Sequence, residues 1–99
     1  MTEGYKDIRL EREGGVATLT LAKPPLNVLD IAMMEEMNRA LSELEGDTAL
    51  RMVVMRAEGK AFSAGVDISD HPADKLGDMI RSFHGIFHRM HLIHAPIVA

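Results

Sequence analysis

The amino-acid sequence predicts an α/β fold in which helices connect the strands of a largely parallel sheet. Strand-like and helix-like periodicities alternate in the order ββ, α, β, α, followed by the opening of another strand. Residues 52–55 form an unbroken apolar run, which is typical of a parallel strand that helices cover on both faces. Residues 95–99 begin an apolar strand and then stop, so we expect the unit to be unfinished at residue 99.

The first two strands are predicted to form a β-hairpin. Residues 8–11 alternate between apolar and polar side chains, as a half-buried strand does. Gly14 and Gly15 supply the positive φ angles that a tight turn needs. The second strand, residues 16–22, ends at the two prolines that follow Lys23, because proline removes a ladder donor.

The first helix is predicted to begin after Asp30, a good capping residue, and to end at Gly46. Helical spacing places five apolar residues on its core face, namely Met33, Met34, Met37, Leu41 and Leu44. The residues predicted on its other faces are Glu35, Glu36, Arg39 and Glu43.

The second helix is predicted to start at Pro72 and to carry a long apolar stripe. The stripe consists of Leu76, Met79, Ile80, Phe83, Phe87 and Met90, widened by Ile86 and Ile93. Gly77 and Gly85 are expected to weaken this helix by about 1 kcal/mol each relative to alanine.

Length, charge and composition exclude several classes of function. A chain of 99 residues suffices for one small domain. A net charge of −4 lacks the basic character of a nucleic-acid binder, and no basic amphipathic stretch or long apolar run indicates a membrane partner. The lack of cysteine excludes disulfides, thiolate metal ligands and a thiol nucleophile. With no signal peptide visible, we expect a cytoplasmic protein.

The segment after the third strand is the strongest candidate for a ligand site. It contains the small residues Gly59, Ser63, Ala64 and Gly65 directly after a predicted buried strand. Ligands of open α/β sheets bind beyond the carboxyl ends of strands. A loop of small residues there can turn main-chain N–H groups toward a ligand carbonyl and stabilise charge on its oxygen. The alternative interpretation is a loop that only connects two elements.

Residues 59–68, Gly-Lys-Ala-Phe-Ser-Ala-Gly-Val-Asp-Ile, resemble the signature loop of the enoyl-CoA hydratase/isomerase (crotonase) superfamily. In order along the chain, residues 16–29, 52–57 and 95–99 also resemble segments of that family. The resemblance implies a crotonase-like spiral of ββα units, of which residues 1–99 would be the N-terminal part of a single domain. It also implies assembly into trimers or pairs of trimers.

The resemblance assigns expected roles to individual residues. The main-chain N–H of Val66 corresponds to one of the family's two oxyanion-hole donors. The residues implied to bind CoA and the acyl group are Lys23, Pro25, Leu26, Ala64, Gly65, Val66, Asp67 and Ile68. Within this set, the main chain of Ala64 corresponds to a contact with the adenine end of CoA. The turn residues Lys23, Pro25 and Leu26 correspond to residues that form a wall of the CoA site. Asp67 and Ile68 correspond to residues that line the acyl and pantetheine passage.

The function implied is that of an acyl-CoA enzyme, in the first place an enoyl-CoA hydratase. Two N–H donors that polarise a thioester carbonyl stabilise an enolate-like intermediate. The CoA thioester is the substrate, and the resemblance implies no bound cofactor and no metal. Residues 66–71, together with residues 79–87, are similar to the cyclic dienoyl-CoA hydratases of anaerobic aromatic degradation.

The resemblance places the second oxyanion donor and the acid/base carboxylates beyond residue 99, so the chain is not expected to catalyse alone. The alternative is a non-catalytic half-domain that binds a partner chain, or CoA without chemistry. The codons after Ala99 in the gene distinguish the two hypotheses. A glycine-rich segment with one or two glutamates favours the enzyme, and a stop codon favours the half-domain.

Several side chains have a chemical and a structural interpretation. His84, His88 and His91 have a spacing that suits a metal, but we favour their lying at the edge of the core or at a subunit interface. Asp67 could serve as a general base, but we favour a carboxylate that shapes the loop. Ser63 has no visible His–Asp pairing, so a loop-shaping hydroxyl is favoured over a nucleophile.

Overall fold

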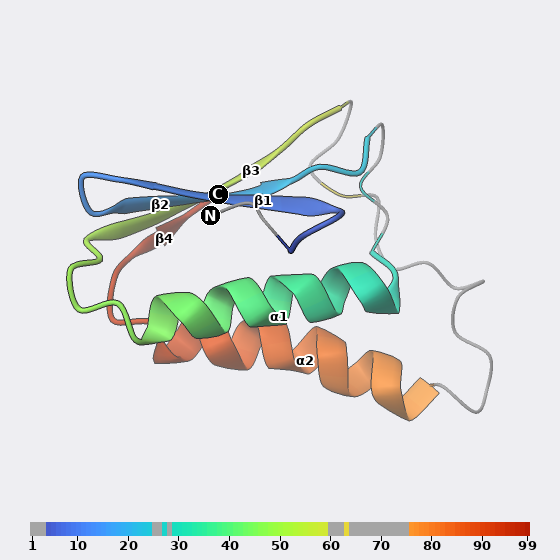
Figure 1. Cartoon of the computed structure of the whole chain (residues 1–99). Coiled ribbons are helices and arrows are strands. Elements are labelled where there is room, and N and C mark those ends of the chain that lie inside the picture. Colours follow the sequence, from blue (N-terminus) through green and yellow to red (C-terminus); the bar gives the residue numbers. More distant parts are fainter. Residues whose placement is uncertain (1–3, 25–26, 28, 60–62, 64–75) are drawn as a thin grey trace.

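The computed structural model describes residues 4–24, 27, 29–59, 63 and 76–99, which form a four-stranded sheet with two helices on one face (Figure 1). Along the chain the elements are β1 (Ile8–Glu13), β2 (Val16–Leu21), α1 (Ile31–Glu45), β3 (Met52–Ala57), α2 (Leu76–Leu92) and β4 (Ile97–Val98). The predicted class and order of elements are confirmed. Neither helix, over its described residues, has the length and apolar character that crossing a membrane requires.

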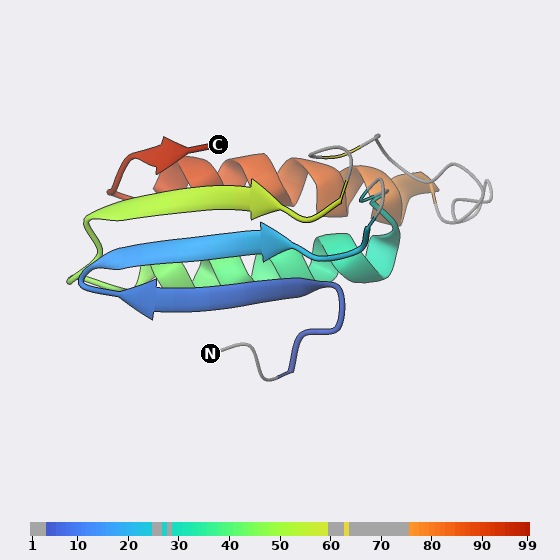
Figure 2. The same cartoon turned by 90° about the horizontal axis from the view of Figure 1, so that it is seen from above.

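The sheet combines one local hairpin with two parallel pairs (Figure 2). β1 and β2 are antiparallel, and the turn between them holds two glycines at positive φ. β2 pairs with β3 in parallel, from Val16 opposite Met52 to Leu21 opposite Ala57. β4 continues the parallel order on the other side of β3. The register brings the carboxyl ends of β2 and β3 level with one another.

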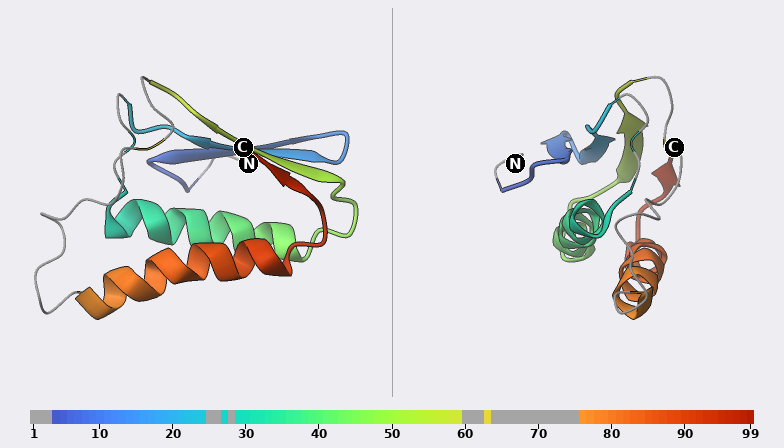
Figure 3. Two further views of the ribbon diagram at one scale, coloured as in Figure 1. Left: turned by 180° about the vertical axis from the view of Figure 1, so that it is seen from behind. Right: turned by 90° about the vertical axis from the view of Figure 1, so that its right-hand side faces the viewer.

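The core lies between the sheet and the helices, and the described residues leave the opposite face of β3 uncovered (Figure 3). Val53 and Met55 are buried in the core, whereas Met52 is 37% exposed and Val54 is half-buried. The described residues thus cover one face of β3, and the expected cover of its second face stays a prediction. Crossovers between parallel strands are right-handed, and the strands advance in one direction from β2 to β4. Both helices consequently fall on the same side of the sheet.

Helix α1 follows its prediction at both ends and along its core face. Asp30 caps the helix, and Gly46 follows its last residue. All five predicted core residues are buried, namely Met33, Met34, Met37, Leu41 and Leu44. Glu36 was predicted on an outer face but is buried. Its carboxylate accepts hydrogen bonds from the N–H groups of Lys6 at 2.9 Å and Asp7 at 2.8 Å, which tie the segment before β1 to the helix.

Helix α2 packs through part of its predicted stripe. Ile86 and the following Ile93 are buried, whereas Ile80 and Phe87 are exposed. The apolar residues that pack against the core from half-buried positions are Met79, Phe83 and Met90. The described part of the sheet and α1 therefore cover only one edge of the predicted stripe. The predicted start at Pro72 lies outside the described residues.

The two helices approach each other closely at Gly85. A Cβ atom at this position would lie 2.9 Å from Asn38 Oδ1 in α1. Asn38 is held in place because its Nδ2 donates to the carbonyls of Met34 at 3.1 Å and Ser82 at 2.9 Å. Gly85, predicted only to weaken α2, therefore also permits the contact between the helices.

Candidate functional site

Two chain segments meet where β2 and β3 end. The segment after β2 runs through Lys23 and Asn27 toward α1, and the segment after β3 runs through Glu58 toward Ser63. The N–H of Glu58 donates to the carbonyl of Leu21 at 2.9 Å, which continues the strand pairing into these segments. Because ligands of α/β sheets bind beyond the carboxyl ends of strands, this junction is the candidate site.

Asn27 closes the turn after β2. The residue is fully buried and has a φ of 49°, in the left-handed region that asparagine adopts more readily than most residues. Its Oδ1 accepts a hydrogen bond from the Lys23 N–H at 2.9 Å, and its own N–H donates to the Lys23 carbonyl at 3.0 Å. The turn is thus held by a side chain and by the main chain together.

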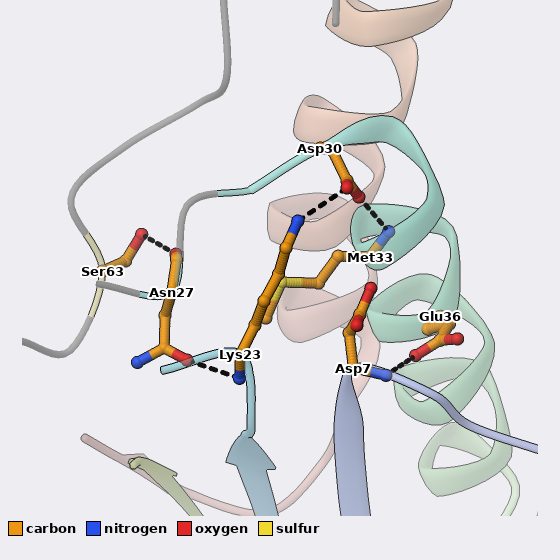
Figure 4. A network of polar contacts seen from close by, with 7 residues as sticks. All are labelled: Asp7, Lys23, Asn27, Asp30, Met33, Glu36 and Ser63. Atoms are coloured by element: carbon orange, nitrogen blue, oxygen red, sulfur yellow. Dashed lines mark hydrogen bonds and ion pairs between the residues drawn. The ribbon is translucent and has the colours of Figure 1, made fainter. Parts of the chain in front are cut away.

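Asn27 also joins this turn to the segment after β3. Its Nδ2 donates to the carbonyl of Glu58 at 2.7 Å. Its carbonyl accepts a hydrogen bond from Ser63 Oγ at 2.8 Å (Figure 4). No role was predicted for Asn27 from the sequence. Its only local signal is an asparagine in a proline-rich turn, a residue type that favours turns and tolerates positive φ.

Lys23, a predicted CoA-binding residue, is fixed over the start of α1. Its Nζ lies 2.6 Å from Asp30 Oδ2, while Asp30 Oδ1 accepts the Met33 N–H at 2.8 Å (Figure 4). Partial burial raises the pKa of Asp30, but the hydrogen bonds from Lys23 and from the Met33 N–H outweigh burial and hold this pKa below its usual value. Asp30 therefore caps the helix and holds the lysine at the same time.

A second ion pair borders the junction on the hairpin side. Arg9 of β1 pairs with Glu58, and this hydrogen bond lowers the pKa of Glu58. Both side chains are partly exposed, so water screens the pair and its contribution to stability is small. Its effect is to hold the Glu58 side chain toward β1, while the Glu58 carbonyl is bonded to Asn27.

An apolar pocket of about 220 Å³ opens beside the junction. Its lining includes Leu21 and Met55 near the strand ends, Ser63, and Phe83 and Phe87 of α2. Ser63 connects the pocket to the segment after β3. The pocket suits an apolar ligand group, because it offers mainly aliphatic and aromatic contacts.

The structure describes only some of the predicted functional residues. Lys23 lies at the junction, and the Ser63 hydroxyl bonds to the Asn27 carbonyl, as the loop-shaping interpretation predicts. The others, Pro25, Leu26, Ala64, Gly65, Val66, Asp67 and Ile68, lie outside the described residues, so their roles remain predictions. His84, His88 and His91 are exposed on α2, and within the described ranges no three metal-binding side chains are grouped to hold an ion.

These features define an α/β protein with a candidate site at the ends of two parallel strands. Residues 11–99 match the family model for enoyl-CoA hydratase/isomerase, and the chain belongs to this family. It is 41% identical over 81 residues to a cyclohexa-1,5-dienecarbonyl-CoA hydratase of Thauera aromatica, covering 82% of this chain and 31% of that protein. It is 32% identical to a short-chain-enoyl-CoA hydratase of Clostridium acetobutylicum, over 94% of this chain and 38% of that protein.

The solved structures show the same fold. An enoyl-CoA hydratase of Mycobacterium smegmatis superposes with a TM-score of 0.86 at 29% identity, over 94% of this chain and 38% of that one. The predicted crotonase-like fold is therefore confirmed. The chain spans about a third of the length of the proteins it matches.

Proposed function

We propose that the protein to which this chain belongs is an enoyl-CoA hydratase, which adds water across the double bond of an enoyl-CoA thioester. In this proposal the Val66 N–H supplies one of two donors to the thioester oxygen. The contacts with CoA and the acyl group come from Lys23, Pro25, Leu26, Ala64, Gly65, Val66, Asp67 and Ile68. Family membership supports the class of reaction, and the names of the relatives support hydration.

The junction between the ends of β2 and β3 is the observation that carries the proposal. Asn27 bonds the turn that contains Lys23 to the carbonyl of Glu58 and to Ser63. The two segments that carry the predicted CoA-binding residues are therefore joined at one place. Val66 comes three positions after Ser63 in the sequence.

The proposed chemistry depends on a polarised thioester carbonyl. As the oxygen of water bonds to the β-carbon and the water gives up one proton to a base, the electrons of the C=C bond move toward the carbonyl oxygen. A proton delivered to the α-carbon then completes the addition. N–H donors aimed at that oxygen stabilise the enolate-like species, and removing one donor from such a site costs roughly 10²–10³ in rate. The donor is main chain, so a valine at position 66 is compatible with the role.

We further propose that the second donor and the acid/base carboxylates come from outside these 99 residues, in an enzyme built as a trimer or a pair of trimers. The relatives are about three times as long as the part of them that this chain matches, which supports the first statement. The chain alone would then bind a CoA thioester without hydrating it.

The proposed acyl group is a cyclic dienoyl group. The 41% identity to the Thauera aromatica cyclohexa-1,5-dienecarbonyl-CoA hydratase supports this choice. The similarity of residues 66–71 to that class, and the apolar pocket beside Ser63, are consistent with it. A short straight-chain enoyl group is the competing substrate, on the likeness to the Clostridium acetobutylicum protein.

Calorimetry of the complete protein with CoA, a short-chain enoyl-CoA and a cyclic dienoyl-CoA tests the proposal. We expect the cyclic thioester to bind most tightly and Lys23→Met to weaken binding several-fold. Arg12→Met, which removes a cation of β1 near the hairpin turn and therefore at the end of the sheet away from the junction, should leave binding unchanged. Loss of the absorbance of the conjugated thioester reports hydration. No heat with any thioester would refute the proposal, and binding without hydration by the complete protein would favour the non-catalytic alternative.

A further inference from the structure

We infer that Asn27 is a positioning residue: it fixes the turn after β2 against the segment after β3, and so sets the separation of Lys23 and Ser63. The inference rests on the proposed function, because it concerns the two walls of that CoA site. Asn27 itself is assigned no contact with the substrate.

The hydrogen bonds of Asn27 reach three separate parts of the chain. Its Oδ1 accepts from the Lys23 N–H at 2.9 Å, and its Nδ2 donates to the Glu58 carbonyl at 2.7 Å. Its carbonyl accepts from Ser63 Oγ at 2.8 Å. Glu58 and Ser63 lie 31 and 36 positions away in the sequence, so these bonds connect segments that the chain itself does not hold together.

The chemistry of the site requires asparagine rather than a related residue. One side chain must accept a hydrogen bond from Lys23 and donate one to Glu58, and a carboxylate cannot donate the second. The φ of 49° disfavours residues other than glycine, asparagine and aspartate. Because the side chain is fully buried, water cannot replace either bond without rearrangement of the turn.

The position of Ser63 matters because a reaction that depends on aligned donors is sensitive to small displacements. A misplacement of about 1 Å can cost about 100-fold in rate even when the mutated residue is remote from the chemistry. Loss of the Asn27 side-chain bonds would remove a direct link between the turn and the Glu58 carbonyl and loosen the turn relative to the segment after β3. Binding of CoA in the ground state is distributed over many contacts, so we expect it to weaken less than the rate falls.

The decisive experiment compares two hydrogen-bonded asparagines in the complete protein, the buried Asn27 and the partly buried Asn38. Asn27→Gly keeps the positive φ and the main-chain groups but removes the side-chain bonds to the Lys23 N–H and the Glu58 carbonyl. Asn38→Ala removes two bonds from the other asparagine, which lies between α1 and α2. Steady-state hydration of a cyclic dienoyl-CoA gives kcat and KM, and thermal melting reports stability.

We expect both variants to melt at lower temperature, but only Asn27→Gly to lose roughly 10- to 100-fold in kcat, with KM changed less than threefold. Should Asn27→Gly not fold, Ser63→Ala removes one bond of the same junction and should lower kcat by several-fold. An unchanged kcat in the variant measured, or an equal loss of kcat in Asn38→Ala, would overturn this inference and leave the proposed function standing. A wild-type protein that binds no CoA thioester would refute the proposed function and this inference together.

Discussion

Helices α1 and α2 lie side by side on the same face of the sheet, yet their apolar surfaces are covered to different extents. Helix α1 buries its full predicted core face against the sheet. Among the described side chains of α2, Ile86 is buried, whereas Phe87 is 55% and Leu92 is 50% exposed. Helical spacing of apolar residues thus predicts a helix in both cases, but the extent of its burial depends on neighbours that the spacing does not reveal.

The largest expected effect is a difference in stability between two leucine-to-alanine variants, one in each helix. Leu41→Ala in α1 removes a fully buried side chain and should lower the free energy of unfolding by about 2–5 kcal/mol. Leu92→Ala in α2 removes a half-exposed one and should cost less than about 1 kcal/mol. Urea unfolding of both variants measures the difference. Equal losses would show that α2 is as well covered as α1.

Substitution by alanine at the two glycines of α2 should change the stability of the protein in opposite directions. At Gly85 a Cβ would lie 2.9 Å from Asn38 Oδ1, so Gly85→Ala should destabilise the protein by about 1–2 kcal/mol despite its better helix propensity. At Gly77 the nearest atom is the end of the Arg81 side chain at 3.4 Å, so Gly77→Ala should stabilise by up to about 1 kcal/mol. Thermal melts of both variants give the signs, and stabilisation by Gly85→Ala would contradict a close helix contact.

The start of α1 should make its stability depend on pH. The pKa of Asp30 is lower in the folded protein than its ordinary value of about 3.9, so its contribution is present above that pH and is lost as the pH falls through the folded pKa. Asp30→Asn keeps a capping side chain but removes the charge. We expect wild type to lose more stability than this variant between neutral pH and about pH 3, as chemical unfolding at each pH would report. Parallel curves would rule out Asp30 as a contributor.

The smallest effect is expected on the exposed surface of α2. Asp78 and Arg81 form an i,i+3 ion pair with both side chains largely exposed. Arg81→Ala should change the free energy of unfolding by no more than about 0.5 kcal/mol, and added salt should remove the difference. Denaturant titrations at low and high salt test this. A salt-resistant loss would indicate that Arg81 has a further partner.

Local rules were sufficient where the partner lies nearby in the chain. The hairpin follows from two adjacent glycines, and the ends of α1 follow from Asp30 and Gly46, whose contacts lie within a few residues. The parallel order of β3 followed from its apolar run. Each of these features depends on residues that lie close together in the sequence.

Residues whose partners are distant escaped prediction. Glu36 looked like an outer-face glutamate, because the sequence does not show that the N–H groups of residues 6 and 7 would lie against it. Asn27 was assigned no role, since its bonds to Glu58 and Ser63 arise only once β2 and β3 are paired. The oxyanion role of Val66 came from resemblance and remains a prediction.

The parallel pairing of β2 with β3 affects the order in which the chain folds. A β-hairpin such as β1–β2 closes a short loop and forms on its own in about 1–10 μs. The register from Val16 opposite Met52 instead closes a long loop, whose entropic cost is repaid only after distant segments meet. Because α1 lies within that loop, its docking on the hairpin shortens the search for β3. We therefore expect the hairpin with α1 to form the folding nucleus, and the junction at Asn27 to be completed late.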